Sequence, residues 1–227
     1  MKGAIAIFVK TPGLSPVKTR LAVKLGQEIA ESFHLASAKT VADVVQLSCE
    51  TEDLTGYFAV AEEAAQDHIY WEDLPCILQG EGGLGERMAH IYHSLLAKYD
   101  FVILIGADIP QMSSADLLQA ASWLSHSEQA RLAFAPSDDG GFWLFGGNCP
   151  IPHTIWGNVV YSAEDTGKQF LKHIEQYGEV KILNTLRDAD VLEDLIPLRE
   201  SLTKLLQAIP AQHALIHFLD TVLPETA

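Results

Sequence analysis

The segment FVILIG, residues 101–106, constrains the fold more than any other part of this sequence. Its unbroken apolar run is typical of a strand buried on both faces, as in the parallel sheets of α/β proteins. Asp108 and Pro110 follow at once, and a proline ends regular strand pairing. The segment therefore predicts a central strand with a carboxylate just beyond its carboxyl end.

Other apolar runs of strand length alternate with segments of helical periodicity. Strands are predicted at 4–9, 55–60, 76–78 and 180–183, two strands around a glycine turn within 131–147, and helices over 21–48, 113–124, 162–174 and from the loop 80–85 onward. This alternation predicts an α/β fold, namely a Rossmann-like three-layer α/β/α arrangement with a mostly parallel sheet. Such sheets bind ligands beyond the carboxyl ends of their strands.

The chain of 227 residues is expected to form a single domain, 1–227, with a helical tail, 196–227. Pro210 is a point at which that tail can break into two helices. The apolar positions of the tail suit packing either on the domain or on a second subunit, so a homodimer is one of the two alternatives.

Thirty acidic and 15 basic residues give a net charge of −15. Nucleic acids and anionic membranes are bound mainly through Lys and Arg, so neither is an expected partner. No apolar run approaches the roughly 20 residues of a membrane-spanning helix. The amino-terminal run ends at Lys10 and Pro12, which indicates a first strand rather than a signal peptide. Together with three widely spaced cysteines, this favours a cytoplasmic protein.

The loop KTPGLSPVKTRL, residues 10–21, concentrates Lys10, Lys18 and Arg20 behind the first strand. Its Pro and Gly residues prevent regular structure, and a helix begins directly after them. A helix start with nearby cations forms an anion site, where Arg20 can bind phosphate oxygens in bidentate fashion and Lys18 acts as a point charge. The loop therefore predicts a phosphate site, the alternative being a solvated surface loop. It has neither GxxxxGK[ST] nor GxGxxG spacing.

Asp108 is the candidate metal ligand. Mg²⁺ is typically held by one or two carboxylates together with substrate phosphates, and a single Asp after a buried strand suits that role. The alternative is that Asp108 caps the helix beginning near Ser113 or closes the turn. The residues alone leave both interpretations open.

Two glycine-rich segments are further candidates. In PSDDGGFWLFGG, 136–147, Asp138 and Asp139 can bind a metal or act as a general base, and Gly140 allows backbone to approach a ligand closely. The alternative is a hairpin turn, for which Asp-Gly is a strong signal. In GEGGLGERM, 80–88, Gly85 and Arg87 can belong to a loop that binds base, ribose or phosphate, or to a tight turn before a helix.

Four motifs in order, AIFVKTPGLSPVKTRLAVKLG, GGLGERM, LIGADIP and APSDDGGFWLFG, resemble the bacterial nucleotide-diphospho-sugar transferase family. Its members are glycosyltransferase-A-like proteins, more distantly similar to the phospholactate and molybdenum-cofactor guanylyltransferases. The resemblance covers residues 3 to 195, where LRDADVLEDL matches the closing motif of the family. It implies a Rossmann-like sheet, an NDP-sugar or NTP, a small-molecule acceptor, and Mg²⁺ or Mn²⁺ as cofactor.

The resemblance also assigns roles to residues of this sequence. Lys10, Lys18 and Arg20 would contact the phosphates, while Asp139 and Gly140 would face the acceptor or the sugar.

Asp108 would stand for the second aspartate of an Asp-X-Asp metal motif. The first aspartate is replaced by Gly106, so a second metal ligand must come from elsewhere, with Asp139 and Asp190 as candidates.

We expect a metal-dependent transferase that uses an activated nucleotide. Glycosyl transfer from an NDP-sugar is favoured because no second basic segment suits a phosphorylated acceptor. Lys18 and Arg20 would stabilise the leaving diphosphate, and Asp139 would deprotonate the acceptor hydroxyl. Nucleotidyl transfer with release of pyrophosphate from an NTP is the alternative, and a non-catalytic nucleotide-binding module is a third.

Overall fold

Seven strands form one sheet in the order β3-β2-β1-β4-β6-β5-β7 in the computed structural model, which describes residues 1–223. The strands are β1 (Gly3–Val9), β2 (Leu54–Val60), β3 (Cys76–Leu78), β4 (Phe101–Gly106), β5 (Arg131–Pro136), β6 (Phe142–Gly147) and β7 (Glu179–Ile182). β6 runs antiparallel to both of its neighbours, and the other pairs are parallel. The predicted mostly parallel sheet and the α/β class are confirmed.

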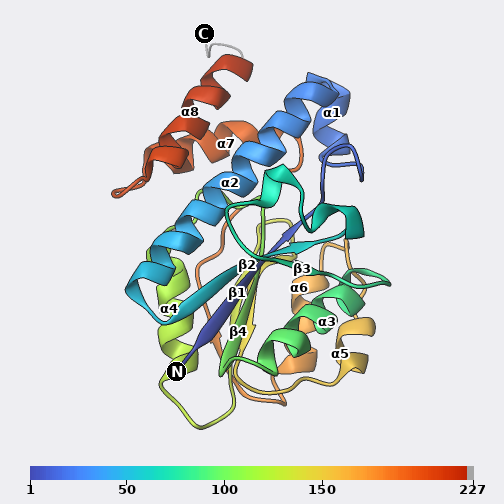
Figure 1. The fold of residues 1–227 in the computed structure, drawn as a ribbon, viewed down its shortest axis with the longest axis vertical. Coiled ribbons are helices and arrows are strands. Elements are labelled where there is room, and N and C mark those ends of the chain that lie inside the picture. Colours follow the sequence, from blue (N-terminus) through green and yellow to red (C-terminus); the bar gives the residue numbers. More distant parts are fainter. Residues whose placement is uncertain (224–227) are drawn as a thin grey trace.

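Helices cover both faces of the sheet (Figure 1). They are α1 (Thr19–Leu25), α2 (Gln27–Thr51), α3 (Leu84–Leu96), α4 (Ser114–Ser125), α5 (His153–Gly157), α6 (Thr166–Ile174), α7 (Leu192–Thr203) and α8 (Pro210–Val222), with short 3₁₀ turns at Glu63–Ala65 and Ile69–Trp71. α2 and α4 pack on one face, and α3, α5 and α6 pack on the other. These are the two outer layers of the expected three-layer arrangement.

The central strands β1 and β4 are apolar on both sides because each side meets a different helical layer. Ile5 and Ile103 face the α2 and α4 side, whereas Ala6 and Leu104 face the α3 and α6 side. Full burial of one such aliphatic side chain contributes about 1.5–3 kcal/mol. The run of FVILIG that predicted a two-sided strand therefore lies at the centre of both hydrophobic layers.

The expected helix over 21–48 is wrong in one respect, because it is two helices that meet at Gly26. Gly26 has φ 87°, a conformation that glycine adopts without strain. Its N–H bonds to the carbonyl of Ala22 and ends α1, while its own carbonyl accepts from Ala30 in α2. The expected helix over 162–174 begins only at Thr166, and α5 was not predicted.

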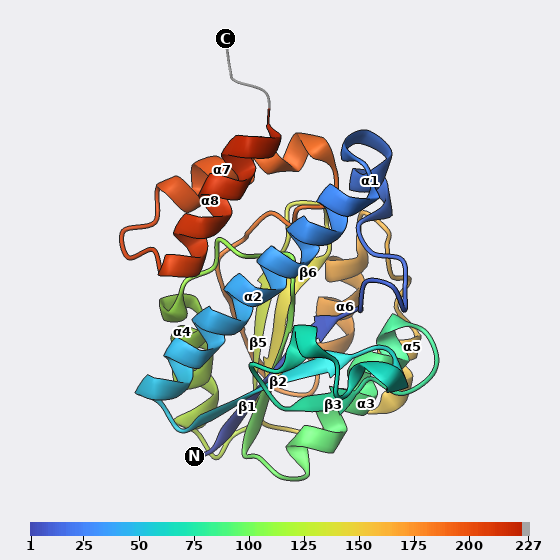
Figure 2. The ribbon, with the colours of Figure 1, turned by 45° about the horizontal axis from the view of Figure 1, so that its top comes forward.

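The tail helices α7 and α8 pack on α1 and α2 through a third hydrophobic cluster (Figure 2). Leu198, Leu202, Leu215 and Leu219 of the tail are buried there against Phe33 of α2. Pro210 is the first residue of α8 and starts that helix, which is the break expected from the sequence. Within residues 1–223, no helix is both long enough and apolar enough to cross a membrane.

The sheet brings four loops to one edge. The loops after β1, β4, β5 and β7 leave the carboxyl ends of their strands, and the loop after β5 is the turn that enters the antiparallel β6. Lys10, Lys18, Asp108 and the turn 137–141, singled out from the sequence, therefore lie in these loops together with Asp190, and Arg20 lies at the start of α1.

Candidate active site

Lys18 links two of these loops. It precedes α1 in a left-handed conformation, φ 42° and ψ 42°, and its side chain is 7% exposed. The ammonium Nζ donates to Asp108 Oδ2 at 3.1 Å and to Asp190 Oδ1 at 2.6 Å. Burial alone would lower the pKa of Lys18, but the two carboxylates more than offset that and raise it. Lys18 is therefore a buried cation held between two carboxylates.

Asp108, Asp188 and Asp190 form an acid cluster. One carboxylate oxygen of each lies within 4.8 Å of the others. Burial, followed by the negative charges of Asp108, Asp139 and Asp190, raises the pKa of Asp188 to about 7. The cluster is thus held together against its own repulsion, with Lys18 as its counter-ion.

The donor set of the acid cluster fits a hard divalent cation. Such cations prefer carboxylate oxygens, and Mg²⁺ binds its ligands at about 2.0–2.1 Å, so that opposite ligands lie about 4.2 Å apart. One oxygen of each of the three carboxylates lies within 4.8 Å of the others, so all three side chains can turn toward one ion. Asp108, Asp188 and Asp190 are therefore the residues that can hold Mg²⁺ or Mn²⁺.

Gly106 occupies the position of the first aspartate in the expected Asp-X-Asp motif. A Cβ atom at position 106 would lie 2.6 Å from Asp108 Oδ1, so the carboxylate of Asp108 occupies the space above that residue. Asp188 and Asp190 approach from the opposite loop instead, and Ala189 N donates to the carbonyl of Asp108 at 3.3 Å. The second and third carboxylates come from a segment 80 residues later in the chain.

Three cavities meet at the acid cluster. The first, of about 470 Å³, is lined by all three cations of the basic loop, Lys10, Lys18 and Arg20, and by Asp108 and Asp190; we call it the basic cavity. Its long basic wall and acidic end match the charge pattern of a polyphosphate held with a metal ion.

The second cavity, of about 240 Å³, is the aromatic cavity. Phe8, Phe142, Trp143 and Tyr161 form its walls, Asp108, Asp139 and Asp188 reach its rim, and none of its lining residues is basic. Aromatic faces with carboxylates at the edge suit an uncharged group rich in hydroxyls.

The third cavity, of about 260 Å³, adjoins the other two. It is lined mainly by carboxylates, Asp138, Asp139, Asp188, Asp190 and Asp194, together with Arg20 and Arg187. We call it the acidic cavity.

The motif at 137–141 forms both a turn and part of the site. Asp139 accepts hydrogen bonds at Oδ1 from Ser137 Oγ and from Gly141 N, so its carboxylate is fixed at the rim of the aromatic and acidic cavities. Asp138 points to the acidic cavity and pairs with Arg187 at 3.3 Å. Gly140, with φ 91°, has no room for a Cβ against the carbonyl of Glu164, so it is required by the turn.

The loop 80–85 behaves as a tight turn before α3. Glu86 closes a capping interaction with Gly83 N at 2.7 Å, and Arg87 Nε donates to the carbonyl of Gly82 at 2.9 Å. A Cβ at Gly85 would collide with the carbonyl of Trp156. Gly85 and Arg87 line none of the three cavities, whereas Leu84 lines both the basic and the aromatic one.

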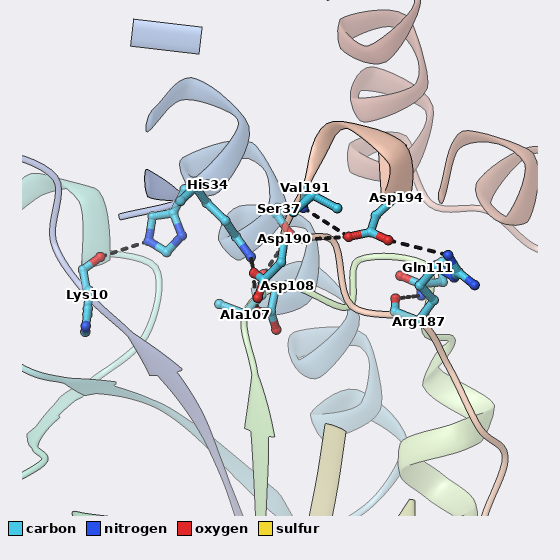
Figure 3. Close-up of polar contacts among 11 residues, drawn as sticks. Lys10, His34, Ser37, Ala107, Asp108, Gln111, Arg187, Asp190, Val191 and Asp194 are labelled. Atoms are coloured by element: carbon cyan, nitrogen blue, oxygen red, sulfur yellow. Dashed lines mark hydrogen bonds and ion pairs between the residues drawn. The ribbon is translucent and has the colours of Figure 1, made fainter. Parts of the chain in front are cut away.

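Two residues of α2 support the site and were not predicted. His34 Nε2 hydrogen-bonds to the carbonyl of Lys10 at 2.8 Å, and Ser37 Oγ donates to the carbonyl of Ala107 at 2.7 Å (Figure 3). Burial lowers the pKa of His34, so the neutral ring donates this bond. Their i, i+3 spacing on one helix face was the available signal.

Comparisons with known proteins agree with this fold. Residues 40–163, more than half of the chain, match the profile of a family described as "Uncharacterized protein conserved in bacteria (DUF2064)". No curated protein matches the sequence. A protein of Desulfovibrio desulfuricans named "putative nucleotide-diphospho-sugar transferase" superposes with a TM-score of 0.83 at 22% identity, covering 98% of this chain and 97% of that one. The resemblance inferred from the motifs is confirmed.

Two more distant structures share the architecture. A 4-diphosphocytidyl-2C-methyl-D-erythritol synthase of Anaerococcus prevotii superposes with a TM-score of 0.56 at 11% identity, over 89% of this chain and 96% of that one. A cytidylyltransferase of Leptospira borgpetersenii superposes with a TM-score of 0.55 at 11% identity, over 100% of this chain and 99% of that one. At these identities the likeness shows the fold.

The glycine loop generates a first prediction. Gly85→Ala should lower the melting temperature, because the added Cβ has no space beside the carbonyl of Trp156. An overpacking cost of about 1–3 kcal/mol corresponds to several degrees in a domain of this size. Gly83→Ala is the matched control, since its Cβ would lie 3.7 Å from the nearest atom. Equal melting temperatures for the two variants, by calorimetry, would contradict this packing role.

The acid cluster generates a second prediction, concerning pH. The pKa of Asp188 in the folded state is raised to about 7, so the folded state binds a proton at Asp188 more tightly than the unfolded state does. As pH rises from about 4 to 7, ionisation of this carboxyl therefore lowers the stability of the folded state. Asp188→Asn removes that penalty. In metal-free protein the variant should melt higher than the parent at pH 8, by on the order of 1 kcal/mol after screening or about 2–4 °C, and the gain should shrink at pH 5. A gain independent of pH would rule out the repulsion.

Proposed function

The chain belongs to the DUF2064 family, and we propose that it is a divalent-metal-dependent transferase that uses an activated nucleotide. One observation carries this proposal. The acid cluster of Asp108, Asp188 and Asp190 lies where the basic cavity meets a cavity without basic residues. A molecule with a negatively charged half and a neutral half fits across this junction.

An NDP-sugar has these two halves. Its diphosphate would lie against Lys10, Lys18 and Arg20, and its sugar would enter the aromatic cavity. Aromatic faces and carboxylates suit a ring with one apolar face and several hydroxyls. The favoured reaction is therefore glycosyl transfer, in which the bond between the sugar and the diphosphate breaks.

The residues of the chain divide the chemical work. A bound Mg²⁺ or Mn²⁺ would neutralise negative charge on the diphosphate. Lys18 and Arg20 would stabilise the charge that grows on the leaving diphosphate. Asp139 is the candidate general base, because both of its hydrogen bonds fall on Oδ1 and Oδ2 is left for an acceptor hydroxyl at the cavity rim.

Nucleotidyl transfer is the second candidate, and two observations favour it. The basic loop directly follows the first strand, where an NTP tail can lie. Of the structural neighbours, one is a cytidylyltransferase by name and another is named a 4-diphosphocytidyl-2C-methyl-D-erythritol synthase. In that reaction a substrate oxygen attacks the α-phosphorus and pyrophosphate leaves. An anionic acceptor would then have to enter the aromatic cavity, whose lining contains no Lys or Arg.

A ligand screen tests the proposal and separates the two reactions. The protein is melted with NDP-sugars and with NTPs, each in Mn²⁺, Mg²⁺ or EDTA. We expect one NDP-sugar to raise the melting temperature only with metal. At a ligand concentration of 100 times Kd, stabilisation is about 2.7 kcal/mol, or roughly 5–10 °C here. Release of nucleoside diphosphate identifies glycosyl transfer, and release of pyrophosphate identifies nucleotidyl transfer.

The screen is repeated on Asp108→Asn, with Asp220→Asn on the outer face of α8 as the matched control. The first variant should lose the metal-dependent part of the shift, and the second should keep it, because Asp220 pairs only with Arg199 on the surface. A shift that is equally large in EDTA, or unchanged in Asp108→Asn, would overturn the metal role.

The position of Lys18 generates a fourth prediction. Its ammonium lies 2.6 and 3.1 Å from two of the oxygens that would hold the metal, so it competes with a cation until a polyphosphate attracts it. Lys18→Met should bind Mn²⁺ alone more tightly, by on the order of a hundredfold, because the repulsion between a single and a double positive charge about 3 Å apart in water is roughly 2.8 kcal/mol. The same variant should bind nucleotide more weakly, since it lacks one phosphate contact.

Lys24→Met on the exposed side of the same helix is the matched control and should leave both affinities unchanged. Both affinities can be measured by calorimetric titration. Weaker binding of Mn²⁺ alone by Lys18→Met would show that the ammonium supports the metal site and does not compete with it.

A further inference from the structure

The C-terminal hairpin of α7 and α8 contacts every segment that carries a charged residue of the acid cluster. Its leucines share one hydrophobic cluster with Leu21 of α1, three residues after Lys18, and with Ala189, between Asp188 and Asp190. Figure 2 shows the hairpin lying across α1 and α2 above the sheet edge. The hairpin is therefore in contact with both sides of the salt bridge between Lys18 and Asp190.

Gln212 of α8 holds the loop that follows Asp108. Its side chain is 2% exposed, and its Nε2 donates to the carbonyls of Pro110 at 3.0 Å and Met112 at 2.9 Å. Its Oε1 accepts from Ile209 N at 3.0 Å, so all of its polar atoms are used. The two carbonyls lie between β4 and α4, outside regular structure. They receive hydrogen bonds from the side chain of Gln212, which is about 100 residues away in the sequence.

Asp194 of α7 holds the other acidic loop. Its Oδ2 accepts from the backbone N–H of Asp190 and of Val191, both at 3.0 Å, and its Oδ1 pairs with Arg187 at 3.4 Å (Figure 3). Gln111 Nε2 also donates to the carbonyl of Arg187 at 2.5 Å, which ties the loop after β4 to this loop. Both acidic loops thus receive side-chain hydrogen bonds at the positions next to their carboxylates.

We infer that the C-terminal hairpin is the frame that sets the spacing of the acid cluster, with Gln212 as positioning residue for Asp108 and Asp194 as positioning residue for Asp190. This inference rests on the proposed function in one respect, namely that the spacing serves a divalent cation. Lys18 offsets only part of the repulsion among the three carboxylates, and backbone that is held on both sides would keep their oxygens within 4.8 Å.

The test compares Gln212→Met with the parent protein. Methionine keeps the length of the side chain but cannot donate to the carbonyls of Pro110 and Met112. Leu95→Ala, in the hydrophobic layer on the far face of the sheet, is the control for general loss of stability. Two quantities are measured well below the melting temperatures: the affinity for Mn²⁺ alone, and amide hydrogen exchange in peptides that cover 106–113 and 187–191.

Gln212→Met should bind Mn²⁺ about tenfold more weakly, the lower end of the effect of losing a residue that orients a metal ligand. Its exchange should rise in 106–113, and Leu95→Ala should show neither change. Asp194→Ala is a second variant that does not depend on the folding of the first, and it removes the acceptor of the Asp190 and Val191 N–H groups. Its exchange should rise in 187–191 and stay unchanged in 106–113.

Unchanged Mn²⁺ affinity in Gln212→Met, or an exchange increase that is equal in Leu95→Ala, would overturn the inference. If the parent protein does not bind Mn²⁺, the proposed metal role fails by itself, and the exchange pattern alone then decides whether the hairpin frames the loops. Increases confined to 106–113 in Gln212→Met and to 187–191 in Asp194→Ala would support the frame, and their absence would reject it.

Discussion

The ammonium of Lys18 between Asp108 and Asp190 is the interaction on which the candidate site depends. A buried charge without a partner is costly, and the ammonium of Lys18 is buried while its two carboxylate partners are partly exposed. Lys18 therefore needs both loops in place, and both loops need Lys18. Lys18, in a left-handed backbone conformation just before α1, thus binds two loops that lie 90 and 172 residues after it in the sequence.

Local sequence patterns specify the sheet well and the side-chain pairing poorly. The apolar runs located all seven strands, and Ser113 marked the start of α4 through its cap with Asp116. The break at Gly26 was missed because apolar periodicity continues across it. Asp188 was missed as a cluster member because its proximity to Asp108 is set by how β7 and α7 pack, which no local spacing encodes.

The glycines show the same limit in another form. Gly85 and Gly140 lie in motifs that suggest ligand contact, yet each is required by a neighbouring carbonyl, of Trp156 and of Glu164. Gly106 is different, because the space above it is filled by the carboxylate of Asp108. A glycine in a functional motif therefore indicates that another atom of the protein or of a ligand lies close to its Cα, and only the fold shows which atom that is.

Charge balance connects these features to function. When all three are ionised, the carboxylates of Asp108, Asp188 and Asp190 leave two negative charges that Lys18 does not neutralise, and the raised pKa of Asp188 is the response of the metal-free site. In the proposed function a divalent cation would supply the missing charge, and a polyphosphate would then pair with the displaced ammonium. A chain with a net charge of −15 that gathers Lys10, Lys18 and Arg20 at this one edge is organised for that exchange of partners. The hairpin of α7 and α8 fixes the backbone on both sides of it, so that the partners change while the carboxylates stay in place.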